Sequence, residues 1–360
     1  MRKTILLLSI VFFLFTKNIF AQSDSSAKPV FSGYVDGYYG YYTDSVGAGN
    51  YQKFPSVSPR TGFGLNTAMI TGSYDGAKVR GIISLQFGDI AKSAWSGTFN
   101  NIMEAHAGLK LCEKIWLDAG FFRTHFGTEG LLPKENIASS ISIGTWYEPY
   151  FESGFRLNYN PSDKLAINLF VLNGYNMYED NNSKKSIGAL ITYALSDKGN
   201  IGYSNYIGDD SPDADTVSHL CIHNNLFWNY KFGKLQTQIG GDYCMQENAD
   251  TTGTKSASMF SGVLGLKYWI KDNWSVYTRE EVFQDEQGFM SGVFTDTLGK
   301  QTGIKMWGAT LGLEYKPTAN SYVRLEARQL QFDDAQAIFW WNKKAVANRM
   351  EMMFHMGISF

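Results

Sequence analysis

The sequence predicts an all-β fold, an antiparallel up-and-down transmembrane β-barrel of about sixteen strands that follows a cleaved signal peptide. Three observations lead to this prediction. Apolar and polar residues alternate with a period of two along most of the chain, as in strands with one apolar face. Short and long connections alternate between these strands. Aromatic residues lie beside the short connections on the apolar face, as in the interface girdles of membrane barrels.

The composition is typical of a protein that exposes only part of its surface to water. Of its 360 residues, 44% are hydrophobic and only 18% are charged, whereas soluble domains carry about 25% charged residues. The 32 basic and 34 acidic residues leave a formal net charge of −2. No basic surface for nucleic acid is therefore expected.

The first 21 residues are typical of a secretory signal peptide. Arg2 and Lys3 precede an apolar stretch at 4–15, and Ala21 is a small residue at a suitable cleavage point. A membrane-spanning helix needs about 20 residues, and this stretch is shorter. We expect cleavage after Ala21, with residues 22–360 forming the barrel. No other stretch resembles a spanning helix, so a membrane protein of this sequence can only be a barrel.

The alternation is clearest in the hairpin at 64–87. Ala68, Ile70 and Tyr74 share one face before a predicted turn at Asp75-Gly76, and pairing residues whose numbers sum to 151 keeps apolar residues opposite each other. A shift by one residue would mix the two faces. The same pattern predicts sixteen strands, at residues 30–42, 64–74, 78–87, 101–111, 115–123, 150–159, 165–173, 186–195, 201–208, 218–230, 235–247, 256–270, 274–285, 305–315, 321–332 and 347–360.

The connections between these strands alternate in length. The longer ones are polar and include 43–63, 124–149 and 286–304, whereas those between them are short turns. Short periplasmic turns and long outer loops are the arrangement of outer-membrane barrels. A soluble sandwich has no reason to segregate its loops in this way. Counts of fourteen or eighteen strands stay open, and the alternation is weakest between 174 and 217.

The apolar face is predicted to meet outer-membrane lipid rather than a dry core. Six aromatic residues beside short turns share the parity of the apolar face: Tyr74, Tyr159, Tyr230, Tyr268, Trp274 and Tyr315. The opposite face carries charges at alternate positions, as in Arg324, Glu326 and Arg328, and such a face needs water. The alternative is a secreted sandwich with solvated outer faces. Glu280 is an exception, because it has the parity of the apolar face.

The last strand alternates apolar and polar residues and ends on Phe360. It resembles the terminal strand of bacterial outer-membrane barrels, whose final Phe is read by the barrel assembly machinery. With the signal peptide, the strand at 279–285 and the stretch 147–156, the mature chain resembles the OmpL-like β-barrel porin-2 family. The resemblance implies an outer-membrane diffusion channel for small polar solutes or ions, with no catalytic residue and no cofactor. General porins are commonly trimers, so a homotrimer is one option.

Strand number supports a channel independently, because sixteen to eighteen strands enclose an aqueous lumen. In general porins the third outer loop folds inward to form the constriction. By analogy, residues 124–149 place Glu129, Lys134 and Glu135 there. Inward parity places six further candidate pore-lining residues on the wall: Arg279, Glu281, Arg324, Glu326, Arg328 and Arg349.

These charges have two interpretations. An acidic loop facing a basic wall would create a transverse field that favours polar over apolar solutes. Alternatively, the charges pair with one another and have no role as a filter. The first interpretation predicts that replacing Arg324 and Arg328 with Ala changes ion selectivity.

Cys221 and Cys244 form a candidate disulfide. If Phe232-Gly233 is a two-residue turn, residues whose numbers sum to 465 are opposite, which pairs Cys221 with Cys244 and His223 with Asp242 on the inward face. An oxidising compartment would permit this cross-link. No third ligand accompanies His223 and Asp242, so a hydrogen bond is expected there rather than a metal site.

Two other classes of function stay open. An outer-membrane lipase would need Ser and His side by side on the lipid-facing surface, but the strand histidines His106, His223 and His355 have inward parity. No hydrolase or metalloprotease motif occurs. A barrel for adhesion or uptake could bind a partner through its outer loops at 209–215 and 246–255. Conductance separates an open porin from both.

Overall fold

The computed structural model describes residues 27–47, 49–55 and 57–360, so the predicted signal peptide lies outside the described residues. Sixteen strands close into one antiparallel barrel. These are β1 (Val30–Tyr42), β2 (Gly62–Asp75), β3 (Val79–Phe87), β4 (Ile102–Cys112), β5 (Ile115–Arg123), β6 (Phe151–Tyr159), β7 (Leu165–Leu172), β8 (Ser186–Ser196), β9 (Gly199–Gly208), β10 (Cys221–Phe232), β11 (Leu235–Gln246), β12 (Ala257–Lys271), β13 (Trp274–Gln284), β16 (Lys305–Tyr315), β17 (Ser321–Phe332) and β20 (Asn348–Ser359).

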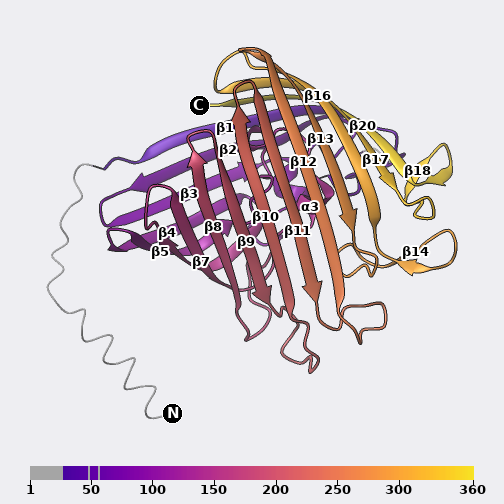
Figure 1. Cartoon of the computed structure of the whole chain (residues 1–360), viewed down its shortest axis with the longest axis horizontal. Coiled ribbons are helices and arrows are strands. Elements are labelled where there is room, and N and C mark those ends of the chain that lie inside the picture. Colours follow the sequence, from indigo (N-terminus) through magenta and orange to yellow (C-terminus); the bar gives the residue numbers. More distant parts are fainter. Residues whose placement is uncertain (1–26, 48, 56) are drawn as a thin grey trace.

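The remaining elements are short and lie in the connections. They are α2 (Asp89–Ser93), the 3₁₀ turn η1 (Pro133–Glu135), α3 (Ile143–Trp146), and two small hairpins made of β14 (Phe294–Thr295) with β15 (Gln301–Thr302) and β18 (Phe339–Trp341) with β19 (Lys344–Val346). Figure 1 shows the tilted strands, with the long loops gathered at one end of the barrel. None of the helices in the described residues is long and apolar enough to cross a membrane.

The predicted strand number is confirmed, but the predicted register of two hairpins is wrong. In the β2–β3 hairpin, Ile70 pairs with Leu85, so partner numbers sum to 155 rather than 151. The backbone N–H of Gly76 donates to the carbonyl of Val79 at 2.9 Å, which makes the turn longer than Asp75-Gly76. Because the error is an even number of residues, both faces keep their residues and the alternation cannot reveal it.

The outer surface of the barrel is apolar, as the alternation predicts. Ile70, Ile83 and Leu311 are each at least 60% exposed although they lie in the middle of strands. The exposed aromatic residues Tyr268 and Trp274 lie where β12 and β13 meet their short turn. The apolar face therefore forms the outside of the barrel and the polar face lines its interior.

The barrel closes between β1 and β20 at the C-terminus. The backbone groups of Gly33 and Phe360 exchange two hydrogen bonds, of 2.7 and 3.0 Å. The Phe360 ring lies over Gly33, at which a Cβ atom would be only 2.5 Å from the ring. A larger residue at position 33 would have to displace the Phe360 ring, which is itself exposed.

Candidate functional site

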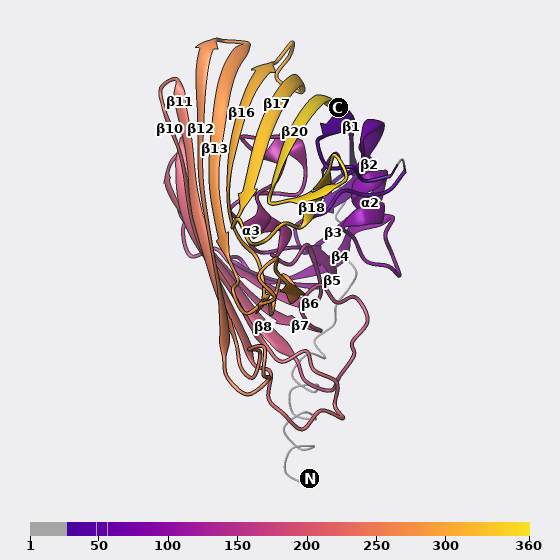
Figure 2. The same ribbon diagram turned by 90° about the vertical axis from the view of Figure 1, so that its right-hand side faces the viewer.

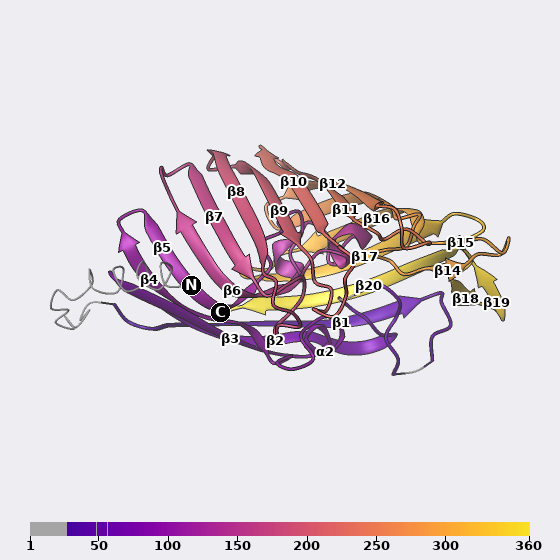
Figure 3. The same ribbon diagram turned by 90° about the horizontal axis from the view of Figure 1, so that it is seen from below.

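Residues 124–149, which connect β5 to β6, lie inside the ring of strands. Figures 2 and 3 show α3 of this segment, hereafter the inward loop, enclosed by the barrel. Thr128 of the loop accepts a hydrogen bond of 2.8 Å from Asn225 on β10 and lies against Gly240 on β11. A Cβ atom on Gly240 would be 2.2 Å from the Thr128 methyl group, so glycine makes room for the loop.

Arg324 on β17 binds the backbone of the inward loop. Its guanidinium donates to the carbonyls of Pro133, Asn136 and Ala138 at 2.8, 3.1 and 3.2 Å. On its other side Nε donates to Glu314 of β16 at 2.6 Å. Five donors in one planar fork allow a single arginine to satisfy several loop carbonyls and a carboxylate at once.

Glu326, two residues along β17, binds the next turn of the loop. Its carboxylate accepts hydrogen bonds from the backbone N–H groups of Ser139 and Ser140 at 2.7 and 3.1 Å, and from the Tyr277 hydroxyl at 2.9 Å. The side chain of Glu326 is almost fully buried. Arg324 and Glu326 therefore hold adjacent parts of the loop through carbonyls and N–H groups respectively.

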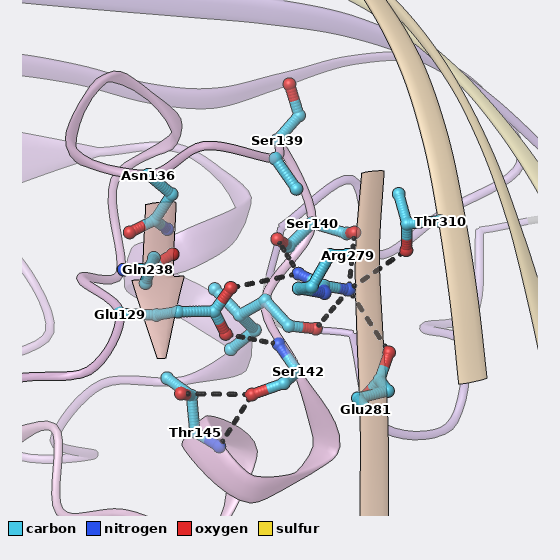
Figure 4. Close-up of polar contacts among 12 residues, drawn as sticks. Glu129, Asn136, Ser139, Ser140, Ser142, Thr145, Gln238, Arg279, Glu281 and Thr310 are labelled. Carbon is cyan, nitrogen blue, oxygen red and sulfur yellow. Dashed lines mark hydrogen bonds and ion pairs between the residues drawn. The ribbon is translucent and has the colours of Figure 1, made fainter. Parts of the chain in front are cut away.

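The loop contributes one carboxylate of its own to a buried charge cluster (Figure 4). Glu129 accepts from Arg279 of β13 at 3.1 Å and from the backbone N–H of Ser142 at 2.7 Å. Glu281, also on β13, accepts from Arg279 at 3.2 Å and from the backbone N–H of Ile143 at 2.7 Å. The start of α3 is thus held by carboxylates from both the loop and the wall.

The charge cluster continues across the wall to β20. Arg328 lies 2.7 Å from Glu281 and 3.4 Å from Glu351, and Arg349 donates to Glu351 at 3.0 Å. Side chains of β13 and β17 can meet because the intervening strand β16 carries small inward residues. At Gly308, for example, a Cβ atom would be 2.9 Å from Glu281. Such buried charges are tolerated because each has a partner.

The predicted site residues thus face the lumen side of the wall but do not contact open water. Arg279, Glu281, Arg324, Glu326, Arg328 and Arg349 are each at most 3% exposed. The inward loop and neighbouring charges cover most of them, whereas Arg349 contacts Lys53 and Phe339 of other connections. Glu129 of the loop lies directly against Arg279 of the wall, and Arg328 pairs with Glu281 and Glu351. Which of the two interpretations describes ion selectivity stays a prediction.

The other two loop candidates lie on a different side of the loop. Lys134 Nζ lies 4.3 Å from the centre of the Tyr34 ring, and burial lowers the pKa of this lysine. Glu135 pairs with Arg123 at 2.6 Å, and both side chains are 29% exposed. Lys134 and Glu135 are both exposed, so these two predicted loop residues retain contact with the lumen, and their role at a constriction stays a prediction.

The register predicted for Cys221 and Cys244 is wrong by two residues. Cys221 pairs with Gln246 and His223 with Cys244, because the turn between β10 and β11 starts after Phe232. Both cysteines are free thiols, and their sulfur atoms are 3.4 Å apart. The predicted contact between His223 and Asp242 is present at 3.1 Å. Within the described residues, no group of three or more His, Cys, Asp or Glu side chains is placed to hold a metal ion.

One group of polar side chains was not singled out from the sequence. Arg80, Asp118 and Arg156 lie on the inner faces of β3, β5 and β6, on the part of the wall where Arg80 and Arg156 remain partly exposed. Their inward parity is visible in the sequence. The sequence does not show that these three residues meet in one row, because that contact depends on the register of four strands.

Comparison with known proteins agrees with this architecture. The anion-selective porin from Comamonas acidovorans has a TM-score of 0.62 and 10% identity, with 93% of this chain and 100% of that chain covered. The outer membrane channel DcaP of Acinetobacter baumannii has a TM-score of 0.62 and 15% identity, covering 94% and 99%. OmpTdeltaL8, a loop-deletion mutant of a Vibrio cholerae outer membrane protein, has a TM-score of 0.60 and 10% identity. The match covers 93% of this chain and 100% of that chain.

These likenesses, all of low identity, show the fold. No curated protein matches the sequence. Residues 30–360 match the family described as "Putative beta-barrel porin-2, OmpL-like", and this range contains every strand of the barrel. A closed barrel with an apolar exterior and a polar interior is consistent with that description. The chain is therefore a porin of the bacterial outer membrane and belongs to the OmpL-like β-barrel porin-2 family.

Proposed function

We propose that small polar solutes or ions diffuse passively through the part of the lumen between the inward loop and strands β3–β6. The observation that carries this proposal is the uneven burial of the inner wall. The loop covers the inner faces of β13 and β17, where Arg279 and Arg324 are buried. Across the lumen, inward side chains such as Arg80 and Arg156 keep more than a fifth of their surface exposed.

Reconstitution into planar bilayers tests this proposal. We expect discrete conductance steps, and liposome swelling that falls with increasing sugar size, because the loop narrows the passage. A correctly folded barrel that gives no steps and no swelling would refute passive diffusion. That result would favour the alternative in which the outer loops bind a ligand or partner.

We infer that the wall residues Arg279, Glu281, Arg324 and Glu326 anchor the inward loop rather than filter ions directly, because each of them is buried and hydrogen-bonds to the loop. Arg328 and Arg349 support this cluster through Glu281 and Glu351. Replacing Arg324 with Ala would leave three loop carbonyls without their donor, so we expect a change in conductance caused by loop movement. A pure shift in ion selectivity at unchanged conductance would instead support a filter.

A channel is favoured over an enzyme even where the side chains resemble a catalytic triad. Ser58 Oγ lies 2.9 Å from His355 Nε2, and His355 Nδ1 lies 3.2 Å from Asp36, the order found in serine hydrolases. All three side chains are fully buried. The backbone N–H of Ser58 already donates to Asn66 at 2.6 Å. We expect no labelling of Ser58 by a fluorophosphonate probe, and labelling would contradict a purely structural role.

The partners that we propose follow from the outer surface. The apolar band would contact outer-membrane lipid, and the exposed Phe360 would be read by the barrel assembly machinery. OmpT of Vibrio cholerae has been solved in a trimer form, and we propose a homotrimer here as well. Chemical cross-linking in native membranes would test this, and cross-linked species no larger than a monomer would count against it.

A further inference from the structure

Four residues on neighbouring strands form one row across the inner wall, near the short turns. In the register of β3 to β6, Arg80 pairs with Gly108, Gly108 with Asp118, and Asp118 with Arg156. All four have the parity opposite to that of the exposed apolar residues, so they face the lumen. None of them belongs to the charge cluster under the inward loop.

The two arginines of the row share one carboxylate. Arg80 donates to Asp118 through Nε at 2.8 Å and through Nη2 at 2.6 Å. Arg156 Nε donates to the same carboxylate at 3.1 Å. Asp118 is fully buried beneath them, whereas the arginine side chains are 24% and 22% exposed.

Aromatic rings and an amide hold the two guanidinium groups in place. The Arg80 guanidinium lies 4.6 Å from the centre of the Trp116 ring, and that of Arg156 lies 4.7 Å from the Phe122 ring. Arg80 also donates to Asn158 at 3.0 Å. Stacking of this kind restrains a side chain that would otherwise be flexible.

Gly108 makes the row possible. A Cβ atom at this position would be 2.1 Å from Asp118 Oδ1 and 2.8 Å from Arg80 Cγ. Arg80 therefore crosses β4 through the space that the glycine leaves. Any larger residue would separate Arg80 from Asp118 while leaving every charge in the sequence.

The row carries more positive than negative charge. Lys110 on β4 adds a third cation beside Trp116, and Asp75 at the end of β2 adds an exposed carboxylate opposite Arg80. Three cations thus stand against Asp118 and Asp75. Within the described part of the chain, the Nη1 groups of Arg80 and Arg156 have no hydrogen-bond partner, so they remain free to donate.

We propose that this row is an anion-binding subsite of the pore that takes small solutes carrying a carboxylate or phosphate group. The inference rests on the proposed diffusion channel, because the solute must pass through the lumen to reach the site. The Nη1 groups of these two preoriented guanidinium groups can each donate to one oxygen of a carboxylate or phosphate group, so one anion can be held by both arginines. Buried Asp118 orients the two guanidinium groups and leaves the site net positive.

Bilayer recordings under a KCl gradient test the charge of the site. We expect the double variant Arg80→Gln, Arg156→Gln to lower the chloride-to-potassium permeability ratio by about sevenfold for each arginine. A unit positive charge about 7 Å away in water stabilises chloride and destabilises potassium by close to RT each. Lys198→Gln, in the exposed turn between β8 and β9, makes the same charge change away from the lumen wall and serves as the control.

Block of the chloride current tests the geometry of the site. Inorganic phosphate and succinate, added separately, distinguish phosphate from carboxylate binding. Gly108→Ala should keep the permeability ratio near that of the native chain but weaken block by at least one of them. Arg80→Lys keeps the positive charge but removes the Nη1 donor, so it should also weaken block at an unchanged permeability ratio. This variant provides the test if Gly108→Ala fails to fold.

The outcomes separate this inference from the proposed function. A native channel that conducts but is blocked by neither anion, or is blocked equally in all variants, overturns the subsite and leaves the channel intact. A folded native protein without conductance overturns both. Loss of block in the arginine and glycine variants, with block retained in Lys198→Gln, supports the subsite.

Discussion

Replacing Glu326 with Gln isolates one anchor of the inward loop. In the native chain the two carboxylate oxygens accept from the backbone N–H groups of Ser139 and Ser140, and from Tyr277. Glutamine has the same shape but only one acceptor oxygen. Whichever way the amide is oriented, one buried loop N–H group faces another donor.

The expected cost follows from the type of bond that is lost. A hydrogen bond to a charged group contributes roughly 1.5–3 kcal/mol. The free energy that favours the bound loop over the displaced loop should therefore fall by about 2 kcal/mol. Because about 1.4 kcal/mol is a factor of ten in an equilibrium constant, the population with a displaced loop should rise roughly 30-fold. The strands themselves should be unaffected, since the ladder hydrogen bonds of β17 do not involve this side chain.

Thiol labelling measures that population. Ser139 is fully buried and its hydroxyl has no hydrogen-bond partner among the described residues, so Ser139→Cys is a mild reporter. In a background without the three native cysteines, Glu326→Gln should raise its labelling rate by about the same factor as the displaced population. Channel recordings should show more frequent transitions between conductance levels.

The control is Glu280→Gln, the same substitution at an exposed position of β13 that points away from the lumen. Its labelling rate should equal that of the reporter alone. A labelling rate in Glu326→Gln that also stays unchanged, in a barrel of native heat stability, would refute the claim that this carboxylate holds the loop.

Three further predictions concern other parts of the chain. Mild oxidation should join Cys221 to Cys244 in a disulfide, because their sulfur atoms are in contact. The mass of the protein should fall by that of two hydrogen atoms, and Cys112 should stay reactive. Three reactive thiols after oxidation would contradict this prediction. Burial, with Asp242 and Glu129 nearby, raises the pKa of Glu148 well above its ordinary value, so its contribution to stability is present at low pH and lost as the pH rises. Glu148→Gln should therefore exceed the native chain in heat stability at alkaline pH and match it near about pH 4, and equal stabilities at both would contradict the burial argument. Mass spectrometry of the mature protein should find its N-terminus at Gln22, and an intact Met1 would refute cleavage after Ala21.

The sequence by itself determined the strands and their faces. Alternation has a period of two, so each residue such as Leu311 or Arg324 is assigned to the apolar or the polar face by its position alone. Sixteen such segments with alternating short and long connections are consistent with few folds other than a barrel. The strand count is confirmed. The charges at 324, 326 and 328 could likewise be placed on one inner face.

Only the tertiary structure decided register and the partners of the inner charges. A slip of two or four residues keeps both faces intact, so the pairings of Ile70 and Cys221 were predicted wrongly although their faces were right. The contact of Glu326 with Ser139 spans 187 residues and uses backbone N–H groups that carry no signature in the sequence. Such contacts exist because barrel closure brings β17 and the loop together, and pattern along a single strand contains no information about that distance.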